Sequence, residues 1–268
     1  MPDAPAMRER LAAQSVIELL LLEQSLVLPR SPIGRLIGRS PLGASSMAWY
    51  RGAMAEIAVG TILAELPAEW TVFHALPADD QGTEIDHLVV GPGGIFAIQT
   101  TRHHGKSVRV AGRTVVVDGE RFPYIRRAEE ESSRVTSLLR DRMLLRASVR
   151  PVVAVVDAKR ITVVQKPAHV KVISAGDLRP WLLTRPHLLD PADRRDAAEI
   201  IDCPETWNAV TGLEPAALTS QFAELESSVR SARHRRLVWV PFGSAAVIVF
   251  VAGIPHLFSA LIGLIGTL

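Results

Sequence analysis

Residues 82–101 have the sequence GTEIDHLVVGPGGIFAIQTT, which predicts two strands joined by a tight turn. Glu84–Val90 and Ile95–Thr101 are alternating and apolar, and the segment GPGG between them supplies turn residues. Side chains alternate between the two faces of a strand, so Gln99 and Thr101 share one face. Asp86 on the neighbouring strand is expected to face these polar side chains. The stretch therefore predicts a β-hairpin that carries polar groups on one face.

The chain around this hairpin alternates between predicted helices and strands. Helical spacing covers 47–66, and a long charged helix is predicted over 126–146. The continuous apolar run Val152–Val156 predicts a strand that is buried on both faces. Further short elements complete the pattern: strands over 71–76, 108–110, 114–117, 161–164 and 170–173, and helices over 177–183 and 192–201. This order predicts an α/β sandwich with a mixed sheet flanked by helices.

Composition excludes several classes of protein. The 268 residues are 48% hydrophobic and 22% charged, which excludes a disordered chain. The formal net charge of +2 excludes a uniformly basic protein that coats DNA. The single cysteine, Cys203, excludes an internal disulfide framework and a cysteine zinc cluster, and it fits a reducing compartment.

The chain ends in 32 residues without a charged side chain, Leu237–Leu268. This length suffices for a membrane-spanning helix, and four arginines lie between 230 and 236, directly before it. The positive-inside rule then places the preceding body in the cytoplasm, so we expect a single-pass protein of the cell membrane. Two alternatives are a re-entrant tail and a buried helix or oligomer interface of a soluble protein.

Four segments follow from these patterns. Residues 1–46 are predicted to be an N-terminal amphipathic helix and a linker rich in Pro, Gly, Ser and Arg. Residues 47–204 form the α/β body, 205–236 a juxtamembrane helix with one apolar stripe, and 237–268 the membrane anchor.

Residues 47–160 resemble the nuclease-related domain (NERD) family, of the PD-(D/E)XK restriction-endonuclease-like superfamily. The resemblance rests on RGAMAE at 51–56, IDHLVVGP at 85–92, IFAI at 95–98, Gly105-Lys106 before the second hairpin, and the approach to the long helix at 119–124. It implies a restriction-endonuclease-like fold. It also implies that Glu56 is the helix acid, Asp86 the metal-binding acid, Gln99 the second metal ligand and Thr101 the residue at the lysine position. The implied cofactor is Mg²⁺ or Mn²⁺ if the site is active, and none otherwise.

Two of these four positions depart from the family pattern. Gln99 still offers a carbonyl oxygen to a metal ion, but Thr101 has no positive charge for the transition state. His103, His104 or Lys106 could take the place of the lysine. In the alternative without a site, Asp86 and His87 only tie down the hairpin, and Glu56 is an exposed helix residue.

Basic residues gather near the predicted site and suit a phosphate backbone, although an ordinary solvated face would have the same composition. They are Arg102, Lys106, Arg109, Arg113, Arg126 and Arg127. We therefore expect a membrane-tethered protein with a degenerate nuclease fold that binds DNA, RNA, a protein partner or a second copy of itself. The alternative is a Mg²⁺-dependent nuclease with a relocated catalytic base.

Overall fold

The structure is a computed structural model, and it describes residues 6–77, 84–145, 147–207 and 214–239. The chain divides into two compact units. Residues 1–20 and 47–218 form the first unit, and residues 21–46 and 219–268 form the second. The sequence pattern had instead predicted one N-terminal appendage over 1–46, so residues on either side of position 20 contribute to different units.

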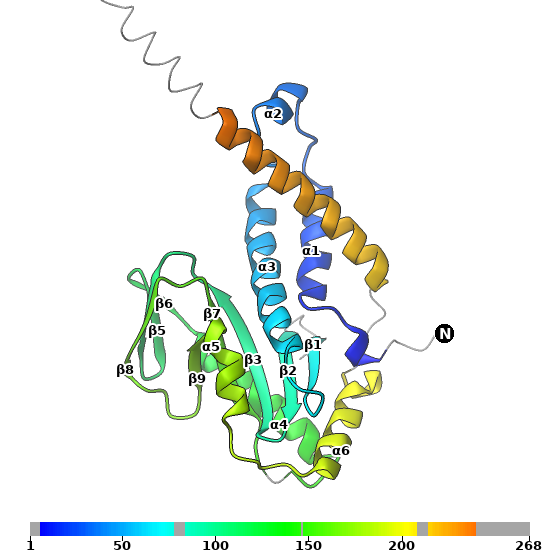
Figure 1. Cartoon of the computed structure of the whole chain (residues 1–268), viewed down its shortest axis with the longest axis vertical. Coiled ribbons are helices and arrows are strands. Elements are labelled where there is room, and N and C mark those ends of the chain that lie inside the picture. The colour runs from blue at the N-terminus through cyan, green and yellow to red at the C-terminus, as the bar shows by residue number, and fades with distance from the viewer. Residues whose placement is uncertain (1–5, 78–83, 146, 208–213, 240–268) are drawn as a thin grey trace, which may run out of the picture. The chain divides into compact units, whose positions relative to one another are not determined.

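The first unit contains two mixed β-sheets (Figure 1). The larger sheet has the strand order β1-β2-β3-β7-β9, and the smaller has β6-β5-β4-β8. The bounds of the larger sheet are β1 Thr71–Pro77, β2 Glu84–Gly91, β3 Gly94–Arg102, β7 Arg150–Val156 and β9 Lys171–Ser174. Those of the smaller sheet are β4 Ser107–Ala111, β5 Thr114–Val117, β6 Glu120–Phe122 and β8 Arg160–Gln165.

Helices cover both faces of the larger sheet. Helices α4 (Tyr124–Arg140) and α6 (Pro191–Asp202) pack on one face through a core that includes Leu88 and Ala97. Helices α3 (Ala44–Ala64) and α5 (Ala175–Leu183) pack on the other face through a core that includes Val89 and Ile98. A third core joins the smaller sheet to the start of α4. Two mixed sheets flanked by helices fit the predicted restriction-endonuclease-like fold.

The predicted hairpin is confirmed. Strands β2 and β3 pair antiparallel, with His87 opposite Ile98 and Gly91 opposite Gly94. The apolar run in β7 is buried along its length from Pro151 to Val156, as expected for a central strand, and β7 pairs parallel to β3 and β9. Helix α4 begins two residues earlier than predicted and ends six residues earlier, at Arg140.

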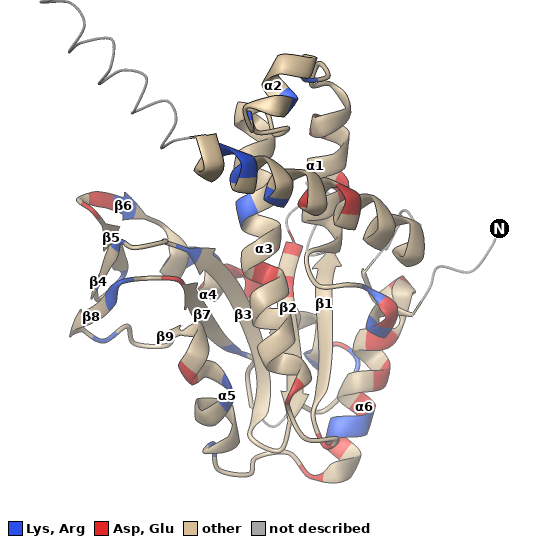
Figure 2. Cartoon of the chain, turned by 45° about the horizontal axis from the view of Figure 1, so that its top comes forward, with Lys and Arg blue, Asp and Glu red and all other residues tan. Residues whose placement is uncertain are grey.

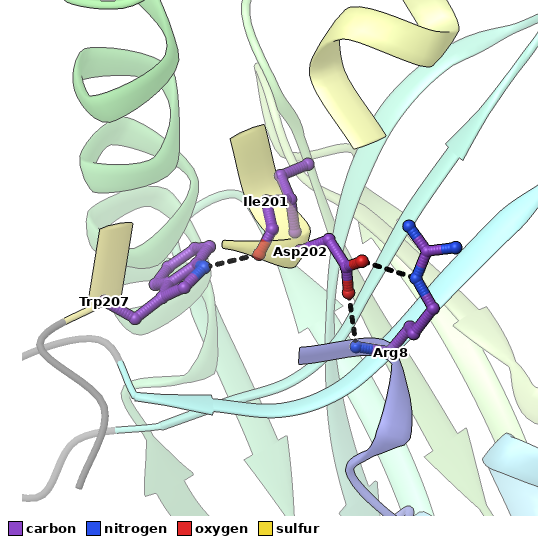
Figure 3. A network of polar contacts seen from close by, with 4 residues as sticks. All are labelled: Arg8, Ile201, Asp202 and Trp207. Atoms are coloured by element: carbon purple, nitrogen blue, oxygen red, sulfur yellow. Dashed lines mark hydrogen bonds and ion pairs between the residues drawn. The ribbon is translucent and has the colours of Figure 1, made fainter. Parts of the chain in front are cut away.

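The N-terminal residues of the first unit are tied to the end of α6 (Figure 3). The Arg8 backbone N–H donates to Asp202 Oδ1 at 2.8 Å, and Arg8 Nε donates to Asp202 Oδ2 at 2.5 Å. The Trp207 indole donates to the Ile201 carbonyl at 2.7 Å, which ties the 3₁₀ turn η2 (Pro204–Trp207) to the end of α6. The segment Met7–Glu9 is itself a 3₁₀ turn, η1, and Met7 lies in the core.

The remaining helices lie in or lead into the second unit. They are α1 (Gln14–Ser25), α2 (Pro32–Leu36) and a helix over residues 215–239. Helix α2 corrects the prediction of a plain linker over 30–46, because Ser31 caps the first turn by accepting a hydrogen bond from Gly34 N and Pro32 begins the helix.

The predicted membrane helix within 237–268 lies outside the described residues from position 240 onward. In the part of the chain that the structure does describe, no helix is both long and apolar enough to cross a bilayer.

Candidate active site

The pairing of β2 with β3 places Asp86 and Gln99 on one face of the larger sheet. The β2–β3 pairing ends with His87 opposite Ile98, and Asp86 and Gln99 are the next residues of the two strands. Both side chains then project on the face of α4, where Leu88 and Ala97 belong to the core. Asp86 Oδ2 accepts a hydrogen bond of 2.5 Å from the backbone N–H of Thr100, which holds the carboxylate against β3.

Asp86 and Gln99 line a cavity of about 470 Å³, which we call the site cavity. Glu84, two residues before Asp86 on the same strand face, lines it too. Helix α4 supplies charged side chains of both signs, and α1 and α3 supply apolar and aromatic ones. These lining residues are Arg126, Arg127, Glu130, Glu131 and Arg134 from α4, Val16 and Leu19 from α1, and Trp49 from α3.

Glu56 on α3 is buried, with 7% of its surface exposed, which contradicts the alternative of an exposed helix residue. Burial, followed by the charges of Asp86 and Glu84, raises the pKa of Glu56 to about 10. Glu56 is absent from the cavity lining, but its carboxyl group is electrostatically coupled to two residues that line it. Figure 2 shows acidic positions where α3 meets the beginning of β2.

Three further carboxyl groups have raised pKa values, and with Glu56 they form what we call the carboxyl cluster. Burial raises the pKa of Asp86 to about 7, against the hydrogen bond from Thr100 N, which lowers it. Burial, and then Asp86, raises the pKa of Glu131 to about 8. Burial raises the pKa of Glu84 to about 6, although a hydrogen bond with Ser15 and the charge of Arg10 lower this pKa in part. The site thus gathers acids that are costly to ionise without a counter-charge.

The site offers unused oxygen atoms. Glu56 Oε2, Glu84 Oε1 and Gln99 Oε1 are buried and have no hydrogen-bond partner among the described residues. Carboxylate and amide oxygens are the donors that Mg²⁺ and Mn²⁺ prefer, so these residues, together with Asp86, fit a hard divalent cation in chemical kind. Within the described ranges, no three His, Cys, Asp or Glu side chains stand in a ready ligating arrangement.

Thr101, at the position of the family's lysine, does not line the site cavity. It is buried, and its Oγ1 lies 3.0 Å from His103 Nε2. The Tyr124 hydroxyl also shares a hydrogen bond with Thr101. His103 packs against Tyr124 and Phe122, with ring centroids 5.6 and 5.5 Å away. Thr101 is therefore held by hydrogen bonds to His103 and Tyr124, whose rings pack against each other outside the cavity lining.

The three residues considered as replacements for the lysine lie in different surroundings. Burial, and then the charge of Lys106, lowers the pKa of His103, so its imidazole is neutral near pH 7. His104 is exposed, with Nδ1 at 3.6 Å from Asp157 Oδ2. Lys106 is also exposed, and its Nζ lies 3.7 Å from Asp118 Oδ2. Only His103 contacts Thr101.

The predicted basic residues separate into two groups. Arg126 and Arg127 line the site cavity, whereas Arg102, Lys106, Arg109 and Arg113 do not. Arg102 pairs with Asp157 at 2.6 Å and Arg113 with Glu129 at 3.0 Å, and Arg109 is exposed on β4. Arg126 Nη1 lies 3.9 Å from Glu130.

Sequence reasoning missed four charged cavity residues: Glu84, Glu130, Glu131 and Arg134. The parity of β2 would have identified Glu84 as a neighbour of Asp86. The positions of Arg127, Glu131 and Arg134 follow an i, i+4, i+7 pattern on α4, which marks one face of the helix. Arg127 and Arg134 both lower the pKa of Glu131, so this face brings cations and an acid to the cavity together.

The comparisons with known proteins give one match. Residues 51–156 match the family model described as nuclease-related domain (NERD). This range runs from within α3 through β1–β6 and α4 to the end of β7, and β8 and β9 lie beyond it. It includes the whole carboxyl cluster and Thr101. No curated protein and no solved structure matches the chain.

Proposed function

Residues 51–156 are a nuclease-related domain, and from that premise we propose that the chain is a membrane-tethered nucleic-acid-binding protein with a degenerate nuclease site. The observation that carries the proposal is the place of Thr101. The position that holds a lysine in the family pattern has a neutral hydroxyl group, which lies 3.0 Å from His103 Nε2 and does not line the site cavity.

The loss of this cation bears on catalysis rather than on binding. Hydrolysis of a phosphodiester builds negative charge on the phosphoryl oxygens, and a preorganised cation stabilises it. Removing one such group typically costs on the order of 10²–10³ in rate. Arg127 and Arg134 at the cavity can bind a phosphate in the ground state, so affinity for nucleic acid is compatible with slow or absent cleavage.

The carboxyl cluster fits a divalent cation. Asp86 and Gln99, with Glu56, Glu84 and Glu131 around them, would hold Mg²⁺ or Mn²⁺, which would supply the positive charge that the cluster lacks. Asp86 is held for this by the hydrogen bond from Thr100 N, and Gln99 lines the same cavity as Asp86. Arg127 and Arg134 would orient the phosphate backbone over the cavity.

An active Mg²⁺-dependent nuclease is the second candidate, and the raised pKa values of the cluster favour it. A cluster of buried carboxyl groups with raised pKa values, three of them lining one cavity, is typical of a catalytic site. In that case His103, through its contact with Thr101 Oγ1, is the group nearest to the vacant lysine position.

Cleavage assays on mixed DNA and RNA with Mg²⁺ and Mn²⁺ separate the two candidates. We expect negligible cleavage by the natural chain and a gain in the double variant Gln99→Glu with Thr101→Lys, with Asp86→Ala as the inactive control. Single restorations are expected to do little, because coupled catalytic residues are non-additive. Robust cleavage by the natural chain that is abolished by Asp86→Ala or His103→Ala would establish the nuclease instead.

Binding is tested separately with labelled oligonucleotides. Arg127→Gln and Arg134→Gln are expected to weaken binding and to reduce its salt dependence, whereas Arg113→Gln, on the smaller sheet away from the site cavity, serves as the matched control. Equal losses in all three variants would assign the binding to general surface charge.

The tethering part of the proposal rests on the sequence after residue 236. Thirty-two uncharged residues follow Arg230, Arg233, Arg235 and Arg236, and this pattern supports a cytoplasmic body with a membrane-inserted tail. Carbonate extraction of membranes from expressing cells is the test. Full-length protein that appears wholly in the soluble fraction without detergent would refute the tethering.

A further inference from the structure

The second unit contains a cavity of about 490 Å³ whose wall is rich in arginine and serine. Its polar lining includes Arg30, Arg35 and Arg235, with Ser227, Ser228 and Ser231 along the helix over residues 215–239. We call it the arginine pocket. All six residues belong to one unit, and none of them lies in the nuclease-related domain.

The geometry of the arginine pocket is fixed by bonds to the backbone. Arg30 Nη1 donates to the Arg39 carbonyl at 2.9 Å, and Arg235 Nη1 donates to the Arg35 carbonyl at 3.0 Å. Gly38, with φ of +75°, lets the turn after α2 approach the helix closely, since an added Cβ would stand 2.5 Å from the Ala232 carbonyl oxygen. The guanidinium groups of Arg30 and Arg235 are thus held against the turn, whereas Arg35 is exposed.

The pocket has positive charge without a partner of opposite sign. Among the described residues, none of its three arginines forms an ion pair with a carboxylate, and the hydrogen bonds that Arg30 and Arg235 donate go to neutral carbonyls. Burial, and then the charges of Arg35 and Arg235, lowers the pKa of Arg30. The sequence of the whole unit contains seven arginines against three glutamates. Figure 2 shows this basic colouring on α2 and on the helix beside it.

Large apolar side chains surround the arginines on the same turn. Leu28 is 88% exposed, Leu26 77% and Ile33 71%. Trp239 Nε1 donates to the Leu36 carbonyl at 3.0 Å, so the α2 turn is joined to the point where the uncharged sequence Leu237–Leu268 begins. Exposed leucines beside arginines are typical of surfaces that lie at a membrane interface, and a nucleic-acid backbone would gain nothing from them.

We propose that the arginine pocket binds the phosphate of an anionic phospholipid, with residues 26–37 lying at the membrane surface. The guanidinium forks of Arg35 and Arg235 suit phosphate oxygens, and the serine hydroxyls can donate to the same group. Gln24 also lines the pocket, and its Oε1 is buried without a partner in the described chain, so it can accept from a headgroup hydroxyl. The proposal adds a lipid site to the tethering proposed above.

Titration calorimetry on the full chain in a neutral detergent tests the site. The probes are short-chain phosphatidylglycerol, short-chain phosphatidylcholine, inorganic phosphate and a 20-nucleotide single strand. We expect saturable binding of phosphatidylglycerol, at least tenfold weaker binding in Arg35→Gln and Arg235→Gln, and binding retained in Arg35→Lys. Arg233→Gln is the matched control, because Arg233 is exposed on the same helix but absent from the pocket lining.

The competing sources give different results. Phosphate that binds as tightly as phosphatidylglycerol would assign the pocket to a free anion and overturn the lipid assignment. An oligonucleotide that binds more tightly, and whose binding is lost in Arg35→Gln, would assign it to nucleic acid. Equal loss in Arg233→Gln would reduce the site to general charge. The titration measures binding of single lipid molecules, so its result does not depend on the result of carbonate extraction, which tests the tethering.

Discussion

Replacing Glu56 with glutamine removes the most strongly perturbed acid of the site while keeping its shape. Its pKa in the folded chain is about 10, compared with the ordinary value of 4.5. A raised pKa means that the folded state binds the proton more tightly than the unfolded state does. The contribution of Glu56 to stability is therefore fully present below pH 4.5 and is lost as the pH rises toward 10.

The slope of this loss is set by one proton. Between the two pKa values, the free energy of unfolding falls by about 1.4 kcal/mol per pH unit. From pH 6.5 to 8.5 the metal-free chain should lose about 3 kcal/mol through Glu56 alone, or about 10 °C in melting temperature for a unit of this size. Glu56 stays neutral across this window, so Glu56→Gln leaves the titrations of Asp86 and Glu131 nearly unchanged.

The assay is thermal unfolding in EDTA at pH 6.5 and 8.5, for the natural chain, Glu56→Gln and the exposed control Glu199→Gln. The measured quantity is the difference in melting temperature between the variants, because other buried groups also titrate. Burial lowers the pKa of His74 and of His87, so their contribution to stability is lost as the pH falls below 6.5, opposite in sense to that of Glu56. Glu56→Gln should melt above the natural chain at pH 8.5, and added Mn²⁺ should narrow that gap. A variant less stable at pH 8.5, or a gap that does not grow with pH, would refute the electrostatic account of the site.

Two further predictions concern packing outside the site. Gly38→Ala should make residues 30–39 accessible to trypsin, because the new methyl group would collide with the carbonyl of Ala232. The control is Gly105→Ala, since Gly105 has a similar φ of +70° but nothing within 4 Å of the added carbon. It should show only backbone strain and no new cleavage at 30–39. Thr136→Val should destabilise the first unit by about 1–3 kcal/mol in a urea titration. The buried N–H of Val149 donates to Thr136 Oγ1 at 3.0 Å, and the substitution removes this acceptor. An unchanged urea midpoint would mean that water replaces the hydroxyl group.

Local patterns predicted most of the first unit. The hairpin of β2 and β3 and the buried strand β7 were predicted because alternation and apolar runs are set by the strands themselves. The sequence predicted that α4 ends at residue 146, six residues beyond its observed end at Arg140. Apolar residues continue to Leu145, but Leu145 packs against the core from an irregular segment and not from the helix. Helix α2 was missed although Ser31-Pro32 is a helix-start signal, because the surrounding Gly, Pro and Ser indicated a linker.

The site was predictable only as far as strand parity reaches. Asp86 and Gln99 follow from two adjacent strands, and Glu84 follows from the same parity although it was overlooked. Glu131 approaches Asp86 only because α4 packs on β3 after the smaller sheet has intervened, and no short-range pattern contains that contact. Thr101 and His103 are only two residues apart, so their contact is local, whereas the packing of Phe122 and Tyr124 against His103 brings together more distant parts of the sequence.

The two halves of the family's catalytic pattern are physically separable in this chain. In the acidic half, Asp86 and Glu131 line the cavity and Glu56 is buried close enough for the charge of Asp86 to raise its pKa, and burial raises the pKa of all three. The cationic half is replaced by Thr101, which the neighbouring aromatic residues satisfy with hydrogen bonds outside the cavity. A buried acid cluster costs stability as the pH rises. Its presence beside a neutral residue at the lysine position agrees with the proposed function, because carboxyl groups can hold a divalent cation without the positive side chain that speeds hydrolysis.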